Sequence, residues 1–227
     1  MPTIFSGTND GHIATDLFDT FKKARSQVAG GSISSTLTRY ASAVFIYAAT
    51  GRGGPVNGIV RSFFEFDTSG ISSAPSSASI FLLGYSNNGA DVILVKSNQS
   101  TTLALDDFDA IVNGAAPLGN SDGSGAGTFA GTSVVTYSAE IATWSTSGYN
   151  EIELNSAALS DIASEDTFKV CFMEYDHDYL DIDPGSSAVI RSGLYYADAV
   201  GTSTDPYLDY TVAAAAVDDA VFFGTNF

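Results

Sequence analysis

The acidic stretch from Glu174 to Asp183 holds the residue types best suited to chemistry in this chain. It reads EYDHDYLDID, and its aspartates are Asp176, Asp178, Asp181 and Asp183. Ca²⁺ is bound by six to eight oxygen ligands, which closely spaced carboxylates supply. The four aspartates therefore have two interpretations: a calcium site, or a solvated acidic loop between two strands.

The same stretch lacks the spacing of two common metal sites. An EF-hand loop has a glycine at its sixth position and a closing glutamate, and neither stands at the required place here. Zinc sites combine several histidine and cysteine ligands, and His177 has no second histidine or cysteine near it in the sequence. We therefore expect no cofactor, with calcium as the alternative.

Acidic pairs elsewhere are of the type that glycoside hydrolases use as acid and base. They stand at Asp106, Asp107 and Asp109, and again at Asp218 and Asp219. Such pairs are common in acidic proteins and mostly face solvent. Ser-His-Asp chemistry would depend on His12 or His177, because the chain has 2 histidines. We expect a protein that is not an enzyme.

Aromatic residues form a second class of candidate binding residues. Trp144 is the only tryptophan, and Tyr195 and Tyr207 belong to a group of tyrosines late in the chain. Rings on the face of a sheet can stack on sugars, which would make these three residues a glycan site. Cross-strand packing is the commoner use of such rings, and Trp144 could equally fill the core.

Charge and composition exclude several classes of partner. The chain has 9 Lys plus Arg against 26 Asp plus Glu, a net charge of −17. Phosphate backbones and anionic membranes attract clustered basic residues, so we expect no nucleic-acid or membrane partner. The single cysteine, Cys171, lies in the apolar run FKVCFM and is expected to be a buried, inert thiol.

Alternating apolar residues predict the strands that would position these groups. In the stretch that begins at Gly58, Val60, Phe64 and Phe66 fall on one face and Arg61 on the other. This alternation is typical of a half-buried strand, with Phe64 and Phe66 as core anchors. Further strands are expected over residues 37–49, 78–85, 91–97, 133–141, 149–154, 167–173, 189–196 and 207–212.

Few helices are expected. Residues 156–164 predict a short helix capped by Asn155 or Ser156, and residues 103–112 space their apolar groups like one or two helical turns. The glycine-rich run from Gly51 to Gly58 is expected to lack regular structure. The pattern predicts an all-β, antiparallel jelly-roll β-sandwich with one or two short helices. It forms one domain over residues 1–212, followed by a tail over residues 213–227.

Three segments share a pattern of core and turn residues with a known family. In RSFFEFDTSGISSAPSSASIFLLGY, the matching positions are Arg61, Phe64, Phe66, Asp67, Ser69, Ile71, Ala78 and Ile80. In GYNEIELNSAALSDIASEDTFKVCF, they are Leu154, Asn155, Ala158 and Ile162, and in GTSTDPYLDYTV they are Asp205, Pro206, Leu208 and Tyr210. Together they resemble the DNRLRE-type jelly-roll modules, and the resemblance implies a double-sheet jelly roll.

Members of that family occur on secreted enzymes, where some resemble carbohydrate-binding modules, and on phage particles. This chain opens without the basic and apolar regions of a signal peptide, and it is nearly all module. These differences from the secreted members favour a stand-alone virion component. We expect it to assemble in the host cytoplasm and to be released by lysis.

Spare apolar surface points to assembly. Phe81, Leu83 and Tyr85 oppose a second apolar row on the same strand, whereas a sandwich strand that faces water is usually polar on one side. The tail adds four large apolar residues, which are Val221, Phe222, Phe223 and Phe227. We expect these seven residues to form an interface. Alternatively, the tail folds back over the protein's own sheet.

The sequence therefore predicts a structural component of a phage-like virion, such as a capsid decoration or cement protein. Its partners would be other virion proteins, capsid or tail subunits, and further copies of itself. The alternative is a carbohydrate-binding module that recognises host or environmental glycans.

Overall fold

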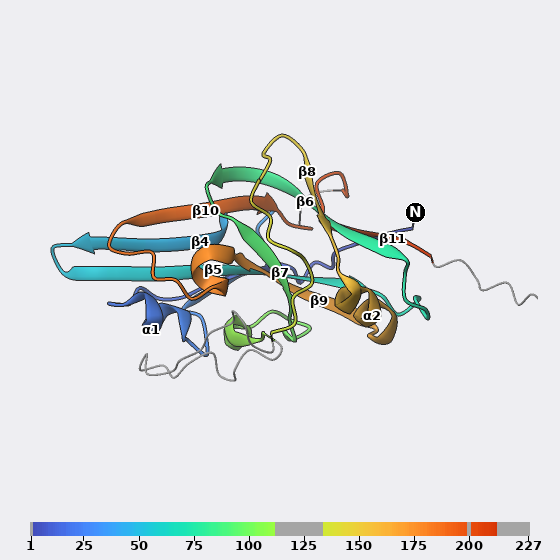
Figure 1. Cartoon of the computed structure of the whole chain (residues 1–227), viewed down its shortest axis with the longest axis horizontal. Coiled ribbons are helices and arrows are strands. Elements are labelled where there is room, and N and C mark those ends of the chain that lie inside the picture. The colour runs from blue at the N-terminus through green and yellow to red at the C-terminus, as the bar shows by residue number, and fades with distance from the viewer. Residues whose placement is uncertain (1, 112–133, 199–200, 213–227) are drawn as a thin grey trace, which may run out of the picture.

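The protein is a β-sandwich, as the sequence predicts. The computed structural model describes residues 2–111, 134–198 and 201–212. Within them, eleven strands join through antiparallel pairs into one continuous hydrogen-bonded sheet that folds into two layers (Figure 1). The prediction of an all-β antiparallel sandwich is confirmed. None of the helices in these residues is long and apolar enough to cross a bilayer.

The strands follow one another with few helical interruptions. They are β1 (Thr3–Phe5), β2 (Gly11–Ala14), β3 (Ser32–Ser34), β4 (Arg39–Gly51), β5 (Gly54–Asp67), β6 (Ser77–Asn88), β7 (Val92–Lys96), β8 (Tyr149–Glu153), β9 (Thr167–Glu174), β10 (Ala188–Tyr195) and β11 (Tyr207–Thr211). The helical segments are α1 (Phe21–Arg25), the 3₁₀ turn η1 (Leu105–Asp109), α2 (Ser156–Ser164) and the π turn η2 (Tyr175–Tyr179).

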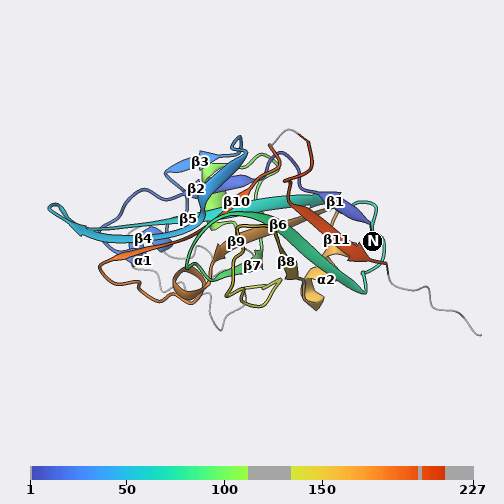
Figure 2. The ribbon, with the colours of Figure 1, turned by 90° about the horizontal axis from the view of Figure 1, so that it is seen from above.

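The long strand β5 is the point at which the two layers divide. Its first half pairs with β4 up to Val60, and its second half pairs with β9 from Ser62 onward. The first layer contains β3, β2, β5, β9 and β7. The second layer contains β10, β6, β8, β11 and β1, and β4 joins it through β10. The β4–β5 hairpin extends away from the end that holds the N-terminus (Figure 2).

The main core lies between the layers. Phe64 and Phe66 of β5 are both fully buried there, which confirms their prediction as core anchors. They meet Ile80 and Leu82 from the second layer, and Phe172 from β9 completes the contact. Large rings buried from water in this way each contribute about 1.5–3 kcal/mol to folding.

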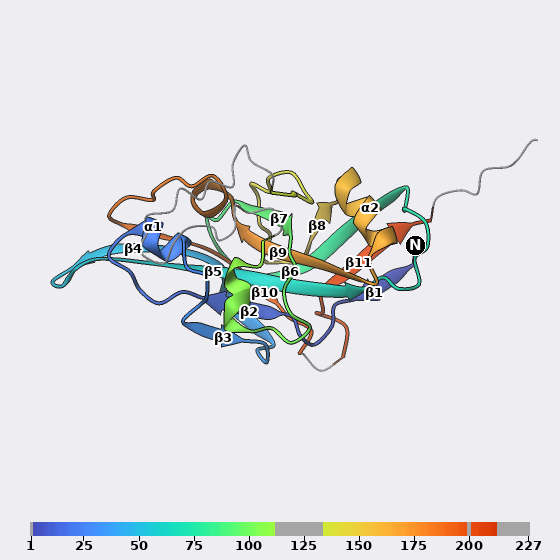
Figure 3. The same cartoon turned by 90° about the horizontal axis from the view of Figure 1, so that it is seen from below.

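The first layer is buried on its other face as well. Phe63, Ile93 and Cys171 stand on that face of β5, β7 and β9, and they form a second apolar cluster with Phe108 of η1 and other residues. Helix α1 lies along the same side (Figure 3). The prediction of a half-buried strand with Arg61 on a polar face is therefore wrong, because segments distant in sequence cover that face.

Local predictions hold where a short motif decides the structure. Helix α2 has the predicted bounds, and the side chain of Asn155 accepts the backbone N–H groups of Ala157 and Ala158 at 3.0 and 3.2 Å. Burial raises the pKa of the Cys171 thiol, which agrees with an inert cysteine.

Two local predictions are wrong. The run from Gly51 to Gly58 is regular, because Gly51 pairs with Gly54 across a tight hairpin turn and β5 continues from there. Gly54 has a φ of +107°, which glycine adopts without strain. Residues 134–141 form only isolated bridges to β7, through Thr136 and Ile141, instead of a strand.

The core assignment predicts the effect of truncating one ring. Phe66→Ala removes a fully buried side chain from between the layers, so we expect the free energy of unfolding in urea to fall by about 3–5 kcal/mol. Val28→Ala is the control, since Val28 is 44% exposed and its truncation should change stability by less than about 0.5 kcal/mol. Equal effects of the two substitutions would contradict the two-layer core.

Candidate functional site

The acidic stretch folds as a compact turn. Glu174 ends β9 with its side chain buried, and its Oε2 atom accepts the backbone N–H groups of His177 at 2.6 Å and Asp178 at 3.0 Å. This capping closes η2 and directs the side chain of Asp178 into the protein. The interpretation of this stretch as a solvated loop is thus wrong for its central residues.

Asp178 pairs with the arginine that the sequence placed on a polar face. Arg61 donates to Asp178 through Nε and Nη2, both at 2.7 Å, and through Nη1 to the carbonyl oxygen of Phe108 at 2.7 Å. Its guanidinium lies 4.1 Å from the centre of the Phe108 ring. Both charged side chains are fully buried, and this two-pronged geometry is the strongest that arginine and carboxylate form.

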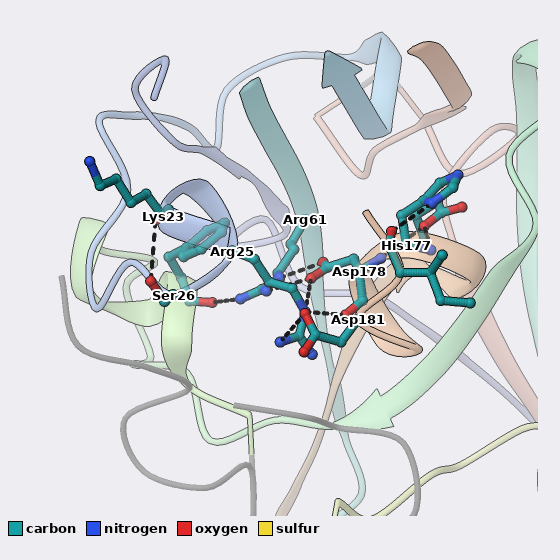
Figure 4. Close-up of polar contacts among 10 residues, drawn as sticks. Lys23, Arg25, Ser26, Arg61, His177, Asp178 and Asp181 are labelled. Atoms are coloured by element: carbon teal, nitrogen blue, oxygen red, sulfur yellow. Dashed lines mark hydrogen bonds and ion pairs between the residues drawn. The ribbon is translucent and has the colours of Figure 1, made fainter. Parts of the chain in front are cut away.

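A second arginine completes the cluster. Arg25 of α1 donates through Nε to the carbonyl oxygen of Asp178 at 2.6 Å, and its Nη1 lies 3.1 Å from Asp181 Oδ1. Figure 4 shows Arg25 and Arg61 pointing toward Asp178 and Asp181 from two different elements. Asp181 has a φ of +59°, a left-handed conformation that aspartate tolerates better than most residues. Two arginines and two aspartates therefore pair in one cluster, which is buried around Asp178 and partly exposed at Asp181.

The structure separates the four aspartates predicted as a metal site. Asp178 and Asp181 pair with arginines, whereas Asp183 is exposed and accepts the N–H of Gly185 at 2.8 Å. Asp176 lies near two other carboxylates, those of Asp91 and Glu140. Across the described residues, no group of three or more His, Cys, Asp or Glu side chains stands ready to hold a metal ion. Calcium at these four positions stays a prediction.

Asp107 and His12, one from each class of candidate catalytic residue, are buried inside the protein. Asp107 is buried and accepts the N–H and hydroxyl of Ser100 and the N–H of Ala104, at 2.8 to 3.1 Å, so it closes the turn before η1. Asp218 and Asp219 lie outside the described residues. His12 is buried and stacks on Tyr40 with 4.1 Å between ring centres, and burial lowers its pKa to about 4.

The outer surface of the second layer carries a cluster of large apolar residues. Ile80, Leu82 and Leu208 face the core, so their neighbours along β6 and β11 face outward. We define the outer aromatic face as Phe5, Phe81, Leu83, Tyr85, Tyr149 and Tyr207. Phe5 is 41% exposed and Tyr85 37%, and the others are half-buried against one another.

The rings of this face pack on each other. Phe81 and Tyr207 stack with 4.6 Å between centres and 9° between planes. Phe5 and Tyr149 each make an edge-type contact with Tyr207, with 6.0 and 5.0 Å between ring centres. The three predicted interface residues of β6, Phe81, Leu83 and Tyr85, thus share one surface, and neighbouring strands extend it. The predicted tail residues Val221, Phe222, Phe223 and Phe227 lie outside the described residues.

Of the three predicted glycan residues, Trp144 lies apart from the two tyrosines. Trp144 is 5% exposed, donates to the carbonyl oxygen of Gly193 at 3.0 Å and contacts Phe172, so it fills the core. Tyr207 belongs to the outer aromatic face. Tyr195 lies beyond it, where its ring meets Tyr85 at 5.6 Å and its hydroxyl accepts from Arg39 at 3.2 Å.

Comparison with known proteins adds no relative. A scan against protein-family models finds no match, and a search of the curated proteins finds none. The resemblance to DNRLRE-type modules therefore stays a prediction from the sequence motifs.

The buried cluster predicts which aspartate the fold needs. Asp178→Asn leaves Arg61 charged and buried without its counter-charge, so we expect the free energy of unfolding to fall by about 3–5 kcal/mol. Asp183→Asn makes the same change on an exposed residue of the same segment and keeps the oxygen that accepts from Gly185. Denaturant unfolding of both variants checks this. A loss from Asp183→Asn as large as that from Asp178→Asn would contradict it.

Glu174 predicts a pH dependence. Burial raises its pKa from 4.5 to about 7, against the backbone N–H groups of Asp178 and His177, which lower it. Between pH 4.5 and about 7, Glu174 holds its proton more often in the folded protein than in the unfolded chain, so the free energy of unfolding falls as pH rises. Glu174→Gln keeps an acceptor oxygen but does not titrate, so we expect a shallower fall from pH 4.5 to about 7.

The control for this experiment is Glu153→Gln, which removes the same charge from an exposed position on β8. It should keep the slope of the unmodified protein. Identical slopes for all three proteins would show that Glu174 titrates normally.

Proposed function

We propose that this protein is a non-enzymatic assembly component that docks onto another protein through its outer aromatic face. The observation that carries the proposal is the group of aromatic and leucine side chains that β1, β6, β8 and β11 place on the outer side of the sandwich. The opposite face of β6 already supplies the core through Ile80 and Leu82. The outward rings are therefore not part of the core between the layers. Apolar patches outside the core often mark interaction sites.

The packing of the rings supports a protein partner over a sugar. A sugar stacks on the open face of a ring. Phe81 and Tyr207 cover one face of each other, and the edges of two further rings meet Tyr207. The rings thus occupy part of one another's faces, and with Leu83 they form the kind of surface that fits a complementary apolar surface of another protein.

The surroundings of the face indicate the chemistry of the partner. Glu151, Glu153 and Asp209 point outward from β8 and β11 beside the rings, and both glutamates line a shallow hollow of about 320 Å³. With a net charge of −17, the protein favours a partner that places basic groups around an apolar centre. We infer that the partner is a capsid or tail subunit and that the protein forms part of a virion surface.

The non-enzymatic part of the proposal starts from the surroundings of the candidate acidic residues. Asp178 and Asp181 are neutralised by arginines, and Asp107 accepts backbone and hydroxyl donors that shape a turn. These groups contribute to the fold, and the proposal places protein docking on the outer aromatic face.

The proposal predicts the effect of a charge placed in the face. Leu83→Glu should weaken docking by at least about tenfold, since an unpaired carboxylate would be buried in the interface. Val189→Glu is the control, because Val189 is 48% exposed on β10 outside the outer aromatic face. Light scattering measures self-association, and co-sedimentation with capsid or tail proteins measures docking.

Unchanged mass and unchanged co-sedimentation for Leu83→Glu would contradict docking through this face. Retention of the unmodified protein on a glycan array, lost in Tyr207→Ala, would favour the carbohydrate-binding alternative instead.

A further inference from the structure

A second group of acidic residues lies where the N-terminal segment meets the residues that lead into β11. Asp10 ends a turn in which its N–H donates to the carbonyl oxygen of Gly7 at 3.2 Å. Its Oδ2 atom accepts the hydroxyl of Ser6 and the N–H of Ala197, both at 2.9 Å. Ser6 in turn donates its N–H to the carbonyl oxygen of Pro206 at 2.8 Å.

These bonds bring three aspartates together from separate parts of the chain. Asp198 follows Ala197, and Asp205 precedes Pro206, so both lie next to residues tied to Asp10 and Ser6. Asp10 is fully buried, and Asp205 is 6% exposed. Two of the three carboxyl groups are thus shielded from water, and Asp198 beside them is half-buried.

One oxygen of each carboxylate is left without a donor. Asp10 Oδ1, Asp198 Oδ2 and Asp205 Oδ1 are shielded from solvent and have no hydrogen-bond partner among the described residues. Buried polar atoms in native proteins nearly always have a partner, and buried charges are paired or bind metals. Glu174 also has one such oxygen, but at this junction three neighbouring carboxylates each have one.

The electrostatics agree with a missing positive charge. Burial, followed by the charges of Asp198 and Asp205, raises the pKa of Asp10 to about 7. Burial also raises the pKa of Asp198 and Asp205, and the charge of Asp198 adds to the shift at Asp205. No arginine or lysine in the described residues contributes to any of these shifts.

We propose that Asp10, Asp198 and Asp205 bind a hard divalent cation of the Ca²⁺ type, which fastens the N-terminal segment to the entry of β11. The donors are all oxygens, which Ca²⁺ prefers, and carbonyl groups of the same turns can add to the carboxylates. The three side chains do not form a ready-made coordination sphere. Binding would require them to turn their free oxygens toward a common centre.

A contrasting cluster on the surface provides the control. Asp91 and Glu140 share a side-chain hydrogen bond, and Asp176 lies near enough to raise the pKa of both. Glu140 is exposed, so water solvates it, and none of the three carries a shielded oxygen without a partner. Negative charge alone is therefore common to both clusters, whereas buried, unsatisfied carboxylate oxygens distinguish the Asp10 cluster.

The site would act on the edge of the outer aromatic face without depending on its function. Ser6 directly follows Phe5, and Pro206 directly precedes Tyr207, so both rings attach next to the proposed tether. A cation here would hold β1 and β11 in register. Docking through the face and cation binding can each fail while the other holds.

The test is a thermal melt of the full chain in excess EDTA and in increasing Ca²⁺, with calorimetric titration of Ca²⁺ to give the stoichiometry. We expect one ion to bind per chain and the melting temperature to rise until the site is saturated. Asp10→Asn and Asp205→Asn should lose both effects. Glu140→Gln should keep both, which separates the buried site from general attraction to an acidic protein.

Three results would overturn the proposal. The first is an unmodified protein whose melting temperature does not respond to Ca²⁺ or Mg²⁺. The second is a Ca²⁺ response that Asp10→Asn retains, or that Glu140→Gln loses instead. The third is a melting temperature that does not change with cations but falls as pH rises through about 7 in the unmodified protein, and does not fall in Asp10→Asn. A proton on Asp10, and no cation, would then neutralise the cluster. Should Asp10→Asn fail to fold, Asp198→Asn replaces it.

Discussion

The buried pair between Arg61 and Asp178 is the contact on which the first layer depends. Strand β5 is covered on both faces, so a guanidinium in its middle has no route to water. Such a charge is tolerated only with a counter-charge and a full set of acceptors. Asp178 and the carbonyl oxygen of Phe108 supply them, and Arg25 adds a further contact. The pair thereby fixes where η1, η2 and α1 lie on the layer.

This constraint also decides where binding can take place. The acidic stretch is the most conspicuous charged motif of the sequence, yet its central carboxylate neutralises an arginine inside the protein. On the outer side of the second layer, the middle of β6 carries the apolar residues Phe81, Leu83 and Tyr85. The central carboxylate of the acidic stretch therefore serves the fold, and the proposed docking surface is the less conspicuous aromatic one.

The sequence predicts those features that short-range patterns control. Phe64 and Phe66 alternate with polar neighbours, and Asn155 caps a helix of the expected length, so both can be found from a few adjacent residues. The burial of Arg61 depends on η1 and η2, which are distant in sequence, and period-two alternation contains no information about them. One sequence signal bears on it: Arg61 is the only basic residue in the long, largely apolar strand β5, and a buried arginine is nearly always paired. The sequence does not predict the tight turn at Gly54, because a glycine-rich run is compatible both with an irregular loop and with a hairpin turn.

A comparison of the buried carboxylates shows how this acidic protein accommodates them. Asp178 has two arginines near it, and Asp107 accepts three donors from its own turn. Glu174 accepts two backbone N–H groups with one oxygen. In each of these cases the chain provides at least two donors to the carboxylate from within the described residues. Asp10 also has two donors, but it lies beside Asp198 and Asp205, whose charges oppose its own. Neutral hydrogen bonds do not remove the repulsion among three carboxylates, and no lysine or arginine of the described residues contributes to their pKa shifts.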